Sequence, residues 1–365
     1  MVQYLIARKD KIVKRRLSNS SSVHKVLILA RHEVQELFSM SEALEAVEYA
    51  FKLEAEGKVI MPPKLYLNLP TYEGDFRAMP AYINGSVGIK WVSVYPNNCK
   101  FNLPTILATI ILCDPETGCP LAIMDGTYIT EIRTGAAGGV AVKYLAKRNS
   151  SVVGIIGAGV QAKTQMLAIG EVLPRIEDVK VFDQNRDTSL EYAEEMGTKL
   201  NMNIRPVETI QEAAEADVVV TTTPSTKPII SPQYIMPGTH INAIGADAKG
   251  KEELEPDLLR KAKIVVDNIE QASHSGEINL PLSQGLIKIE DIAATLGEVV
   301  AGFKRVRESD DDITIFDSTG LAIQDIATAR VVFEKARKKP RSNICWLAVT
   351  SNKVSRILKE KGDYF

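Results

Sequence analysis

Residues 157–162 read Gly157-Ala158-Gly159-Val160-Gln161-Ala162, which is the pattern G-x-G-x-x-A. The apolar run Val152 to Ile156 precedes this stretch and a helical segment follows it, which is the context that a dinucleotide-binding turn requires. Gly157 permits the tight turn, Gly159 lets the backbone approach a pyrophosphate, and Ala162 allows close packing of helix on strand. The free N–H groups at the helix start favour phosphate. The stretch therefore predicts a dinucleotide-binding α/β unit.

An acidic residue at the end of the next expected strand bears on which dinucleotide is bound. Asp183 follows Val181-Phe182, 26 residues after Gly157. A carboxylate there accepts hydrogen bonds from the adenosine ribose and repels a 2′-phosphate, so the pattern favours NAD. Arg186 could accommodate that phosphate, which leaves NADP as an alternative. Binding of another nucleotide, or of none, is the remaining alternative.

Outward from this stretch, the chain alternates short runs rich in Val and Ile with helical segments. Continuous apolar strands separated by helices are typical of a parallel sheet that is covered on both faces. Val152 to Ile156 and five further runs give six expected strands, as in a doubly wound dinucleotide fold. The other runs are Val179 to Phe182, Val218 to Thr221, Ile241 to Ile244, Ile264 to Val266 and Ile313 to Phe316. We therefore predict a Rossmann-type domain over residues 148–320.

The preceding residues follow a different pattern. A strand is expected at Val26 to Leu29, and Ser39 with Glu42 forms a possible capping box for a helix that ends at Gly57. Strand-like segments without crossover helices come next, which predicts an antiparallel or mixed sheet. These segments are Lys64 to Leu69, Gly88 to Val94, Thr105 to Cys113 and Pro120 to Asp125, and a helix over about 130–147 follows them.

A final helix carries Ala322, Ile326, Ala329 and Phe333 on one face, so we expect it to return and pack on the first sheet. The predicted fold class is therefore α/β, with a Rossmann-type doubly wound parallel sheet plus an α+β domain. The α+β domain spans residues 26–147 and is completed by residues 321–340. Residues 1–25 read as a basic leader outside the fold, expected to be disordered, and residues 341–365 form a tail of unknown role.

Composition narrows the class of protein. The 365 residues carry a formal charge of −2, which gives no reason to expect a nucleic acid or an anionic membrane as partner. No apolar run reaches the roughly 20 residues that span a bilayer. The four cysteines form no C-x-x-C pair, and no spacing indicates a metal site. We therefore expect a cytoplasmic protein without a metal.

Basic residues in apolar settings of the first half are candidates for substrate binding. These are Lys64, Arg77, Lys90 and Arg133. Each alone could be a surface cation or half of an ion pair. Together they suit a carboxylate substrate, because Arg binds a carboxylate bidentately and a desolvated Lys reaches the pKa range of a general base.

Asp247 is the acidic candidate. It lies just past an expected strand end, where doubly wound sheets bind ligands. The alternative is a helix N-cap, because Glu252, Glu253 and Leu254 follow.

At these motifs the chain resembles the ornithine cyclodeaminase/mu-crystallin family, from about Val26 to about Lys338. Nine stretches in the right order are more specific than any single one. They are Met61-Pro62-Pro63-Lys64, Gly88-Ile89-Lys90-Trp91-Val92, Leu103-Pro104-Thr105, Arg133-Thr134-Gly135-Ala136-Ala137, Gly157 to Ala162, Thr221-Thr222-Thr223-Pro224, Asn242 to Lys251, Ser275-Gly276-Glu277-Ile278 and Phe316-Asp317-Ser318-Thr319-Gly320.

The resemblance implies a homodimer in which the first domain and the C-terminal helix bind substrate while the second domain binds NAD. It implies that Lys64, Lys90 and Arg133 hold the substrate carboxylate and amine, and that Asp247 exchanges a proton beside the reacting carbon. The cofactor contacts that it implies, besides the glycines, are Thr105, Val160, Gln161, Asp183, Thr223, Ile244, Gly245, Ala246, Asp247, Lys251 and Ser318.

Two departures from the cyclodeaminase pattern bear on activity. Two residues before the Met that corresponds to Met79, cyclodeaminases carry a Glu, whereas this chain has Arg77. At the position of Lys64, cyclodeaminases carry an Arg. Both changes favour a small monoamino acid, as in the alanine dehydrogenase members. The implied activity is therefore NAD-dependent, reversible oxidative deamination of L-alanine to pyruvate and ammonia. The alternatives are ornithine cyclodeamination to L-proline, reduction of a ketimine or pyrroline-2-carboxylate, and non-enzymatic ligand binding.

Overall fold

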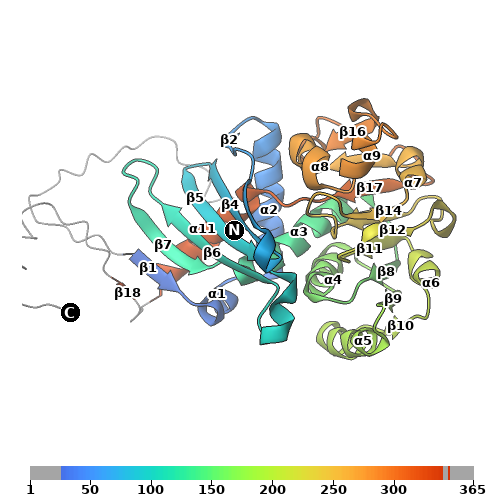
Figure 1. Cartoon of the computed structure of the whole chain (residues 1–365), viewed down its shortest axis with the longest axis horizontal. Coiled ribbons are helices and arrows are strands. Elements are labelled where there is room, and N and C mark those ends of the chain that lie inside the picture. The colour runs from blue at the N-terminus through green and yellow to red at the C-terminus, as the bar shows by residue number, and fades with distance from the viewer. Residues whose placement is uncertain (1–25, 340–343, 346–365) are drawn as a thin grey trace, which may run out of the picture.

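The computed structural model describes residues 26–339 and the backbone of Ile344 and Cys345. The predicted leader and most of the predicted tail lie outside the described residues. Two eight-stranded sheets dominate the chain, one on each side of the view in Figure 1. Among the described residues, no helix is long and apolar enough to cross a membrane.

The first sheet has the order β18-β1-β7-β6-β5-β4-β2, with β3 added on β4. Strands β1 and β7 pair in parallel and the other neighbours are antiparallel, so the predicted mixed sheet is observed. The strands are β1 (Val26–Leu29), β2 (Val59–Ile60), β3 (Leu65–Leu69), β4 (Gly74–Ile83), β5 (Ser86–Val94), β6 (Ile106–Cys113), β7 (Pro120–Asp125) and β18 (Ile344–Cys345).

Four helices cover one face of this sheet or its ends: α1 (Arg31–Leu37), α2 (Met40–Ala55), α3 (Thr127–Leu145) and α11 (Ala322–Ala336). The capping box of α2 is observed, because the Ser39 side chain accepts from Glu42 N and the Glu42 side chain accepts from Ser39 N. Helix α11 packs on β4, β5, β6 and α2, as its apolar face predicted. Figure 1 shows this orange helix among the strands of the first sheet, although it follows the second sheet in the chain.

The second sheet is parallel throughout and has the order β10-β9-β8-β11-β13-β17-β15-β16. The strand order reverses beside β8, which makes the carboxyl ends of β8 and β11 the expected ligand position. The strands are β8 (Val152–Ile156), β9 (Asp178–Phe182), β10 (Ile204–Pro206), β11 (Val218–Thr221), β13 (His240–Ala243), β15 (Lys263–Val266), β16 (Ile292–Thr295) and β17 (Thr314–Asp317). The predicted Rossmann-type fold class is confirmed.

Helices lie on both faces of this sheet: α4 (Val160–Val172), α5 (Arg186–Leu200), α6 (Ile210–Ala214), α7 (Pro256–Lys261), α8 (Ile269–Ser275), α9 (Asn279–Ser283) and α10 (Leu296–Val300). A separate two-stranded sheet joins β12 (Thr226–Ile230) to β14 (Glu252–Leu254). The suggestion that Asp247 caps a helix formed by residues 252–254 is therefore wrong. Those residues extend as a strand because both Glu252 and Glu253 are buried rather than solvated on a helix turn.

Candidate functional site

The glycine-rich turn between β8 and α4 has the geometry of a phosphate-binding loop. Gly157 has φ +89°, a conformation that other residues rarely adopt. A Cβ at Gly159 would meet no atom within 4 Å, so the backbone there is open to a ligand. Val160 begins α4 and is 56% exposed although it is apolar. These features fit a pyrophosphate at the helix N-terminus.

Asp183 closes this loop from the neighbouring strand. Its carboxylate accepts hydrogen bonds from Ala158 N and from Asn185 N, both at 2.9 Å. Arg186, which could accommodate the 2′-phosphate of NADP, forms an ion pair with Glu208. The hydroxyl of Ser318 is buried and has no hydrogen-bond partner among the described residues. A bound dinucleotide would supply such a partner, so the residues present fit NAD.

Glu253 holds together the other two turns at this edge of the sheet. It is fully buried, and its two carboxylate oxygens accept four hydrogen bonds. The donors are Thr221 Oγ1, Thr223 N and Thr223 Oγ1, each at 2.7 Å, and Gly245 N at 2.9 Å. The turn after β11 and the turn after β13 are thereby fixed relative to each other. Ile244 and Ala246, the neighbours of Gly245, are also buried.

The first sheet brings Lys64 to the same region. The half-buried Lys64, just before β3, donates a hydrogen bond from Nζ to the carbonyl oxygen of Thr319 at 2.6 Å. Burial lowers the pKa of Lys64 to about 8, with Arg77 and Arg133 acting in the same direction. A lysine with this pKa holds a substantial fraction of free amine near neutral pH and can act as a general base.

Asp247 is held between two cations. Arg77 Nη1 lies 3.2 Å from Asp247 Oδ2, and Lys251 Nζ lies 2.6 Å from Asp247 Oδ1. These cations hold the pKa of Asp247 well below its usual range despite burial, so it is a carboxylate at neutral pH. Asp75 takes the other side of the guanidinium, with its Oδ1 at 2.8 Å from Arg77 Nε.

Arg133 and Lys90 share one carboxylate that the sequence did not reveal as functional. Asp325, fully buried on α11, lies 2.9 Å from Arg133 Nε and 2.8 Å from Lys90 Nζ. Arg133 Nη1 donates to Gln324 Oε1 at 3.2 Å, which leaves Nη2 without a hydrogen bond to any described residue. Burial and Arg133 lower the pKa of Lys90, while Asp325 opposes them.

We refer to Lys64, Arg77, Lys90, Arg133 and Asp247 as the charged cluster. The structure brings these five predicted residues together from both halves of the chain. Thr105 is exposed before β6, and its carbonyl accepts from Tyr95 N, so its cofactor contact stays a prediction. Gln161 lies in the first turn of α4, where its side chain accepts from Thr164 Oγ1. Among the described residues, no group of His, Cys, Asp and Glu could hold a metal ion.

The residues missed from the sequence are the partners of these cations. Asp325 lies three residues after Ala322 and four before Ala329, so it interrupts the apolar face of the last helix. A single carboxylate on such a face is the signal that could have identified it. Asp267 directly follows β15, at the edge where Asp183 and Asp247 were recognised.

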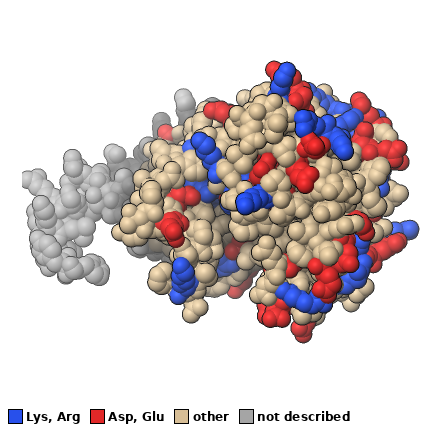
Figure 2. All heavy atoms as spheres, turned by 45° about the vertical axis from the view of Figure 1, so that its right-hand side comes forward, with Lys and Arg blue, Asp and Glu red and all other residues tan. Residues whose placement is uncertain are grey.

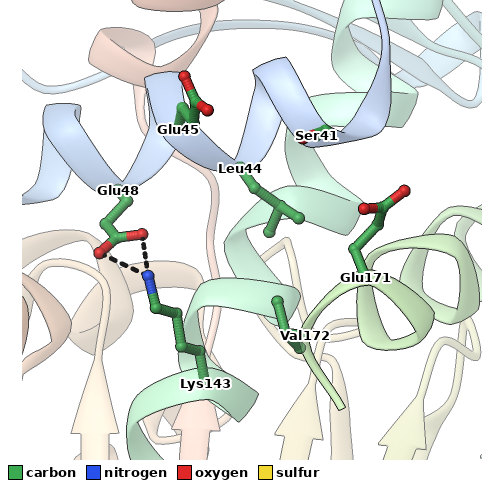
Figure 3. A pocket seen from close by; sticks show the side chains of 7 residues that line it. All are labelled: Ser41, Leu44, Glu45, Glu48, Lys143, Glu171 and Val172. Atoms are coloured by element: carbon green, nitrogen blue, oxygen red, sulfur yellow. Dashed lines mark hydrogen bonds and ion pairs between the residues drawn. The ribbon is translucent and has the colours of Figure 1, made fainter. Parts of the chain in front are cut away.

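A hollow of about 280 Å³ lies between α2, α3 and α4, away from this site. Figure 3 shows Ser41, Leu44, Glu45, Glu48, Lys143, Glu171 and Val172 around it, with Lys143 paired to Glu48. Glu171 and Val172 end α4, whereas the glycine-rich turn begins it; 13 residues at about 1.5 Å each separate the two ends by about 20 Å. The hollow is therefore distinct from the charged cluster.

The fold and the site define a class: a doubly wound α/β protein with a glycine-rich phosphate loop, in which the first sheet and α3 place a cluster of cations beside that loop. A model of the ornithine cyclodeaminase/mu-crystallin family matches residues 24–340. The chain belongs to this family. It is 54% identical to an alanine dehydrogenase from Archaeoglobus fulgidus over 316 residues, which cover 86% of this chain and 96% of that protein.

Two solved structures are similar over almost their whole length. One is an archaeal alanine dehydrogenase dimer with bound NAD, with a TM-score of 0.86 and 51% identity over 89% of this chain and 100% of that chain. The other is a Δ1-pyrroline-2-carboxylate reductase from Thermococcus litoralis in complex with NADH and L-proline. Its TM-score is 0.83, with 43% identity over 86% of this chain and 98% of that chain.

Proposed function

We propose that this chain is an NAD-dependent alanine dehydrogenase, which converts L-alanine, NAD⁺ and water reversibly into pyruvate, ammonium, NADH and a proton. The observation that carries the proposal is the position of Lys64, a lysine of lowered pKa, beside two substrate-binding cations at the glycine-rich edge of the second sheet. The identity to the Archaeoglobus fulgidus enzyme supports the choice of substrate.

The substrate carboxylate binds to Arg133. Asp325 and Gln324 engage Nε and Nη1, so the guanidinium is held in one orientation while Nη2 receives the anion. Lys90 contacts the same Asp325; burial lowers its pKa to about 7, and in its protonated form it adds positive charge behind this group. Such positioning lowers the barrier because the reacting carbon is placed before the chemistry begins.

Lys64 is the proton acceptor of the reaction. As free amine it takes a proton from the substrate ammonium group and passes it to solvent. It then takes a proton from the water that adds to the iminium carbon and returns this proton to the amine, which leaves as ammonia. Asp247, kept ionised by Arg77 and Lys251, stabilises the positive charge that develops at this position. NAD, when bound between the glycine-rich turn and Ser318, supplies the acceptor for the hydride that leaves Cα.

Arg77 selects for a monoamino acid. Its side chain is 7% exposed and fixed by Asp75 and Asp247, with its guanidinium 5.4 Å from the centroid of the Tyr66 ring. A second ammonium group on a diamino substrate would be desolvated next to this cation, which costs energy. We infer that ornithine is a poor substrate for this reason.

A homodimer is the proposed assembly. The face of the first sheet opposite α11 is apolar and exposed, with Leu65 at 61%, Leu67 at 47%, Trp91 at 41% and Leu107 at 40%. Strand pairing places Trp91 opposite Ala78, and Ala78 opposite Leu65, in one row. A contiguous apolar face of this kind indicates a partner. Figure 2, by contrast, shows acidic and basic side chains interspersed over the part of the molecule that holds the second sheet.

Reduction of Δ1-pyrroline-2-carboxylate is the second candidate. The 43% identical reductase supports it. The cations of the charged cluster support it too, because that cyclic imine also carries a carboxylate next to the carbon that accepts hydride. In that reaction Lys64 would donate a proton rather than accept one.

Absorbance at the NADH band separates these functions. Purified protein with NAD should produce NADH on addition of L-alanine and none on addition of L-ornithine. If NADH is consumed rapidly with Δ1-pyrroline-2-carboxylate while alanine gives no signal, the reductase is correct. Ammonia and proline formed from ornithine without net NADH would make the protein a cyclodeaminase and would contradict the role given to Arg77.

A further inference from the structure

The turn formed by Thr319 and Gly320 touches two members of the charged cluster. Lys64 Nζ donates to the carbonyl oxygen of Thr319 at 2.6 Å. Gly320 has φ +76°, and a Cβ on it would lie 2.6 Å from Arg133 Nη1. The position of this turn therefore helps to set the position of the proposed base and of the proposed carboxylate-binding group.

Asp267 holds this turn. The residue is fully buried immediately after β15, and its own N–H donates to the carbonyl oxygen of Asp317 on β17 at 3.1 Å. Its carboxylate accepts from Thr319 N and from Gly320 N, both at 2.6 Å, and from Thr319 Oγ1 at 2.9 Å. Hydrogen bonds to an ionised acceptor are about twice as strong as neutral ones, so three of them make a rigid support.

We propose that Asp267 is a positioning residue for Lys64: it fixes the lysine amine through the Thr319 carbonyl and adds a buried carboxylate to the charged groups around that amine. The inference rests on the proposed function, because it assigns to Asp267 the control of a base that acts in that reaction. The role differs from that of Asp247, whose two carboxylate oxygens are engaged by Arg77 and Lys251.

The charges around Lys64 oppose one another. Arg77 from β4 and Arg133 from α3 lower its pKa, as does burial, and Lys90 on β5 is a further cation that interacts with it. Asp267 and Asp247 raise the pKa, and Asp267 has the larger effect of the two. Loss of a neighbouring opposite charge shifts a pKa by about 1–3 units. Without the Asp267 charge, the pKa of Lys64 should therefore fall by about one unit or more.

The test compares Asp267→Asn with Asp217→Asn. Asp217 is a matched control, because it also accepts two backbone hydrogen bonds, from Ser151 N and Val152 N, but lies at the opposite edge of the same sheet and pairs with Lys147. In Asp267→Asn the maximal kcat/KM should fall at least tenfold, and the acid limb of its pH profile should move from about pH 8 to lower pH by about one unit or more. Asp217→Asn should lower Tm without moving the limb.

Competitive labelling with acetic anhydride, read by peptide mass spectrometry, measures the pKa of Lys64 without any turnover. If the labelling pKa falls in Asp267→Asn but wild-type protein shows no activity with alanine, the positioning role stands and the proposed function fails. If neither the labelling pKa nor the acid limb moves, and Tm falls as it does in Asp217→Asn, Asp267 is only a structural support and the inference is overturned.

Thr319→Val provides the second test should Asp267→Asn fail to fold. The variant removes one of the three hydrogen bonds to the turn but keeps the charge, so kcat should fall about tenfold with the acid limb unmoved, because the turn that carries the Thr319 carbonyl is held less firmly. Thr319→Ser should restore the wild-type value. Equal kcat for Thr319→Val and wild type would overturn the positioning role.

Discussion

Lys64 combines a lowered pKa with a fixed position, and both properties can be measured. Its pKa of about 8 predicts that kcat/KM for alanine oxidation rises with pH and levels off above pH 8, because only the free amine accepts a proton. Lys64→Met should lower kcat by about 10²–10⁴-fold while the Kd for NAD stays within about twofold, since general-base catalysis contributes roughly that factor.

Lys58→Met is the control for this substitution. Lys58 belongs to the same segment, is exposed and, within residues 26–339, forms its ion pair with Glu56, so its loss should leave kcat and the pH profile unchanged. A Lys64→Met variant that keeps wild-type kcat would exclude Lys64 from the chemistry.

Asp183 should decide between the two nicotinamide dinucleotides. Its carboxylate, held by Ala158 N, would repel a 2′-phosphate. Asp183→Ser should therefore raise the ratio of kcat/KM for NADP to that for NAD by at least tenfold, measured with alanine as substrate. Asp187→Ser, in the first turn of α5, is the matched control and should leave the ratio unchanged. An unchanged ratio in Asp183→Ser would mean that the ribose is recognised elsewhere.

Individual cations were visible in the sequence, but their counterions were not. Arg133 and Lys90 stand in apolar stretches, which marks them as unusual. Asp325 is 192 residues from Arg133, and no local pattern links the two. Burial of three charges in one place is tolerable only when they pair, so the structure was needed to show which carboxylate neutralises which cation.

Among elements, six of the eight strands of the parallel sheet were predictable because they are continuous apolar runs between helices; the two edge strands, β10 and β16, were not predicted. Strand β4, Gly74–Ile83, was not predicted although it pairs with β5, β2 and β3 in the first sheet. Arg77 and Pro80 interrupt its apolar pattern, and Arg77 points to the buried side because Asp75 and Asp247 neutralise it. Arg77, the residue proposed to select the substrate, thus interrupts the hydrophobic periodicity by which the strand could have been predicted.

Glu253 on the short strand β14 supports a prediction about cofactor affinity. Glu253→Gln replaces one acceptor oxygen by an amide donor that faces Thr223 or Gly245, so at least one of four hydrogen bonds is lost. At about 1.5–3 kcal/mol for a hydrogen bond to a charged group, the Kd for NAD should rise at least tenfold.

Titration of NADH fluorescence measures this effect. Glu255→Gln, two residues further on, is the control, because the Glu255 carboxylate accepts from Ser231 Oγ rather than from the turns after β11 and β13. A Glu253→Gln variant with wild-type Kd would show that these turns hold their positions without the carboxylate.

At the scale of the whole molecule, the exposed apolar face of the first sheet predicts the oligomeric state. Leu107→Asp puts a charge on that face, so a dimer should dissociate to a monomer of about half the mass by light scattering. Leu190→Asp, on the exposed side of α5, should leave the mass unchanged. A wild-type protein that is monomeric at micromolar concentration would contradict the proposed assembly.

The return of α11 to the first sheet has a consequence for biosynthesis. Arg133 and Lys90 emerge from the ribosome long before Asp325, which comes 192 residues after Arg133. At about 5–20 residues per second, roughly 10–40 seconds pass before the counterion is made. During this interval the first half of the nascent chain cannot neutralise its buried cations. Its final packing must therefore wait until the whole second sheet and α11 have been translated. The two halves of the chain are thus expected to complete their folding together, late in synthesis.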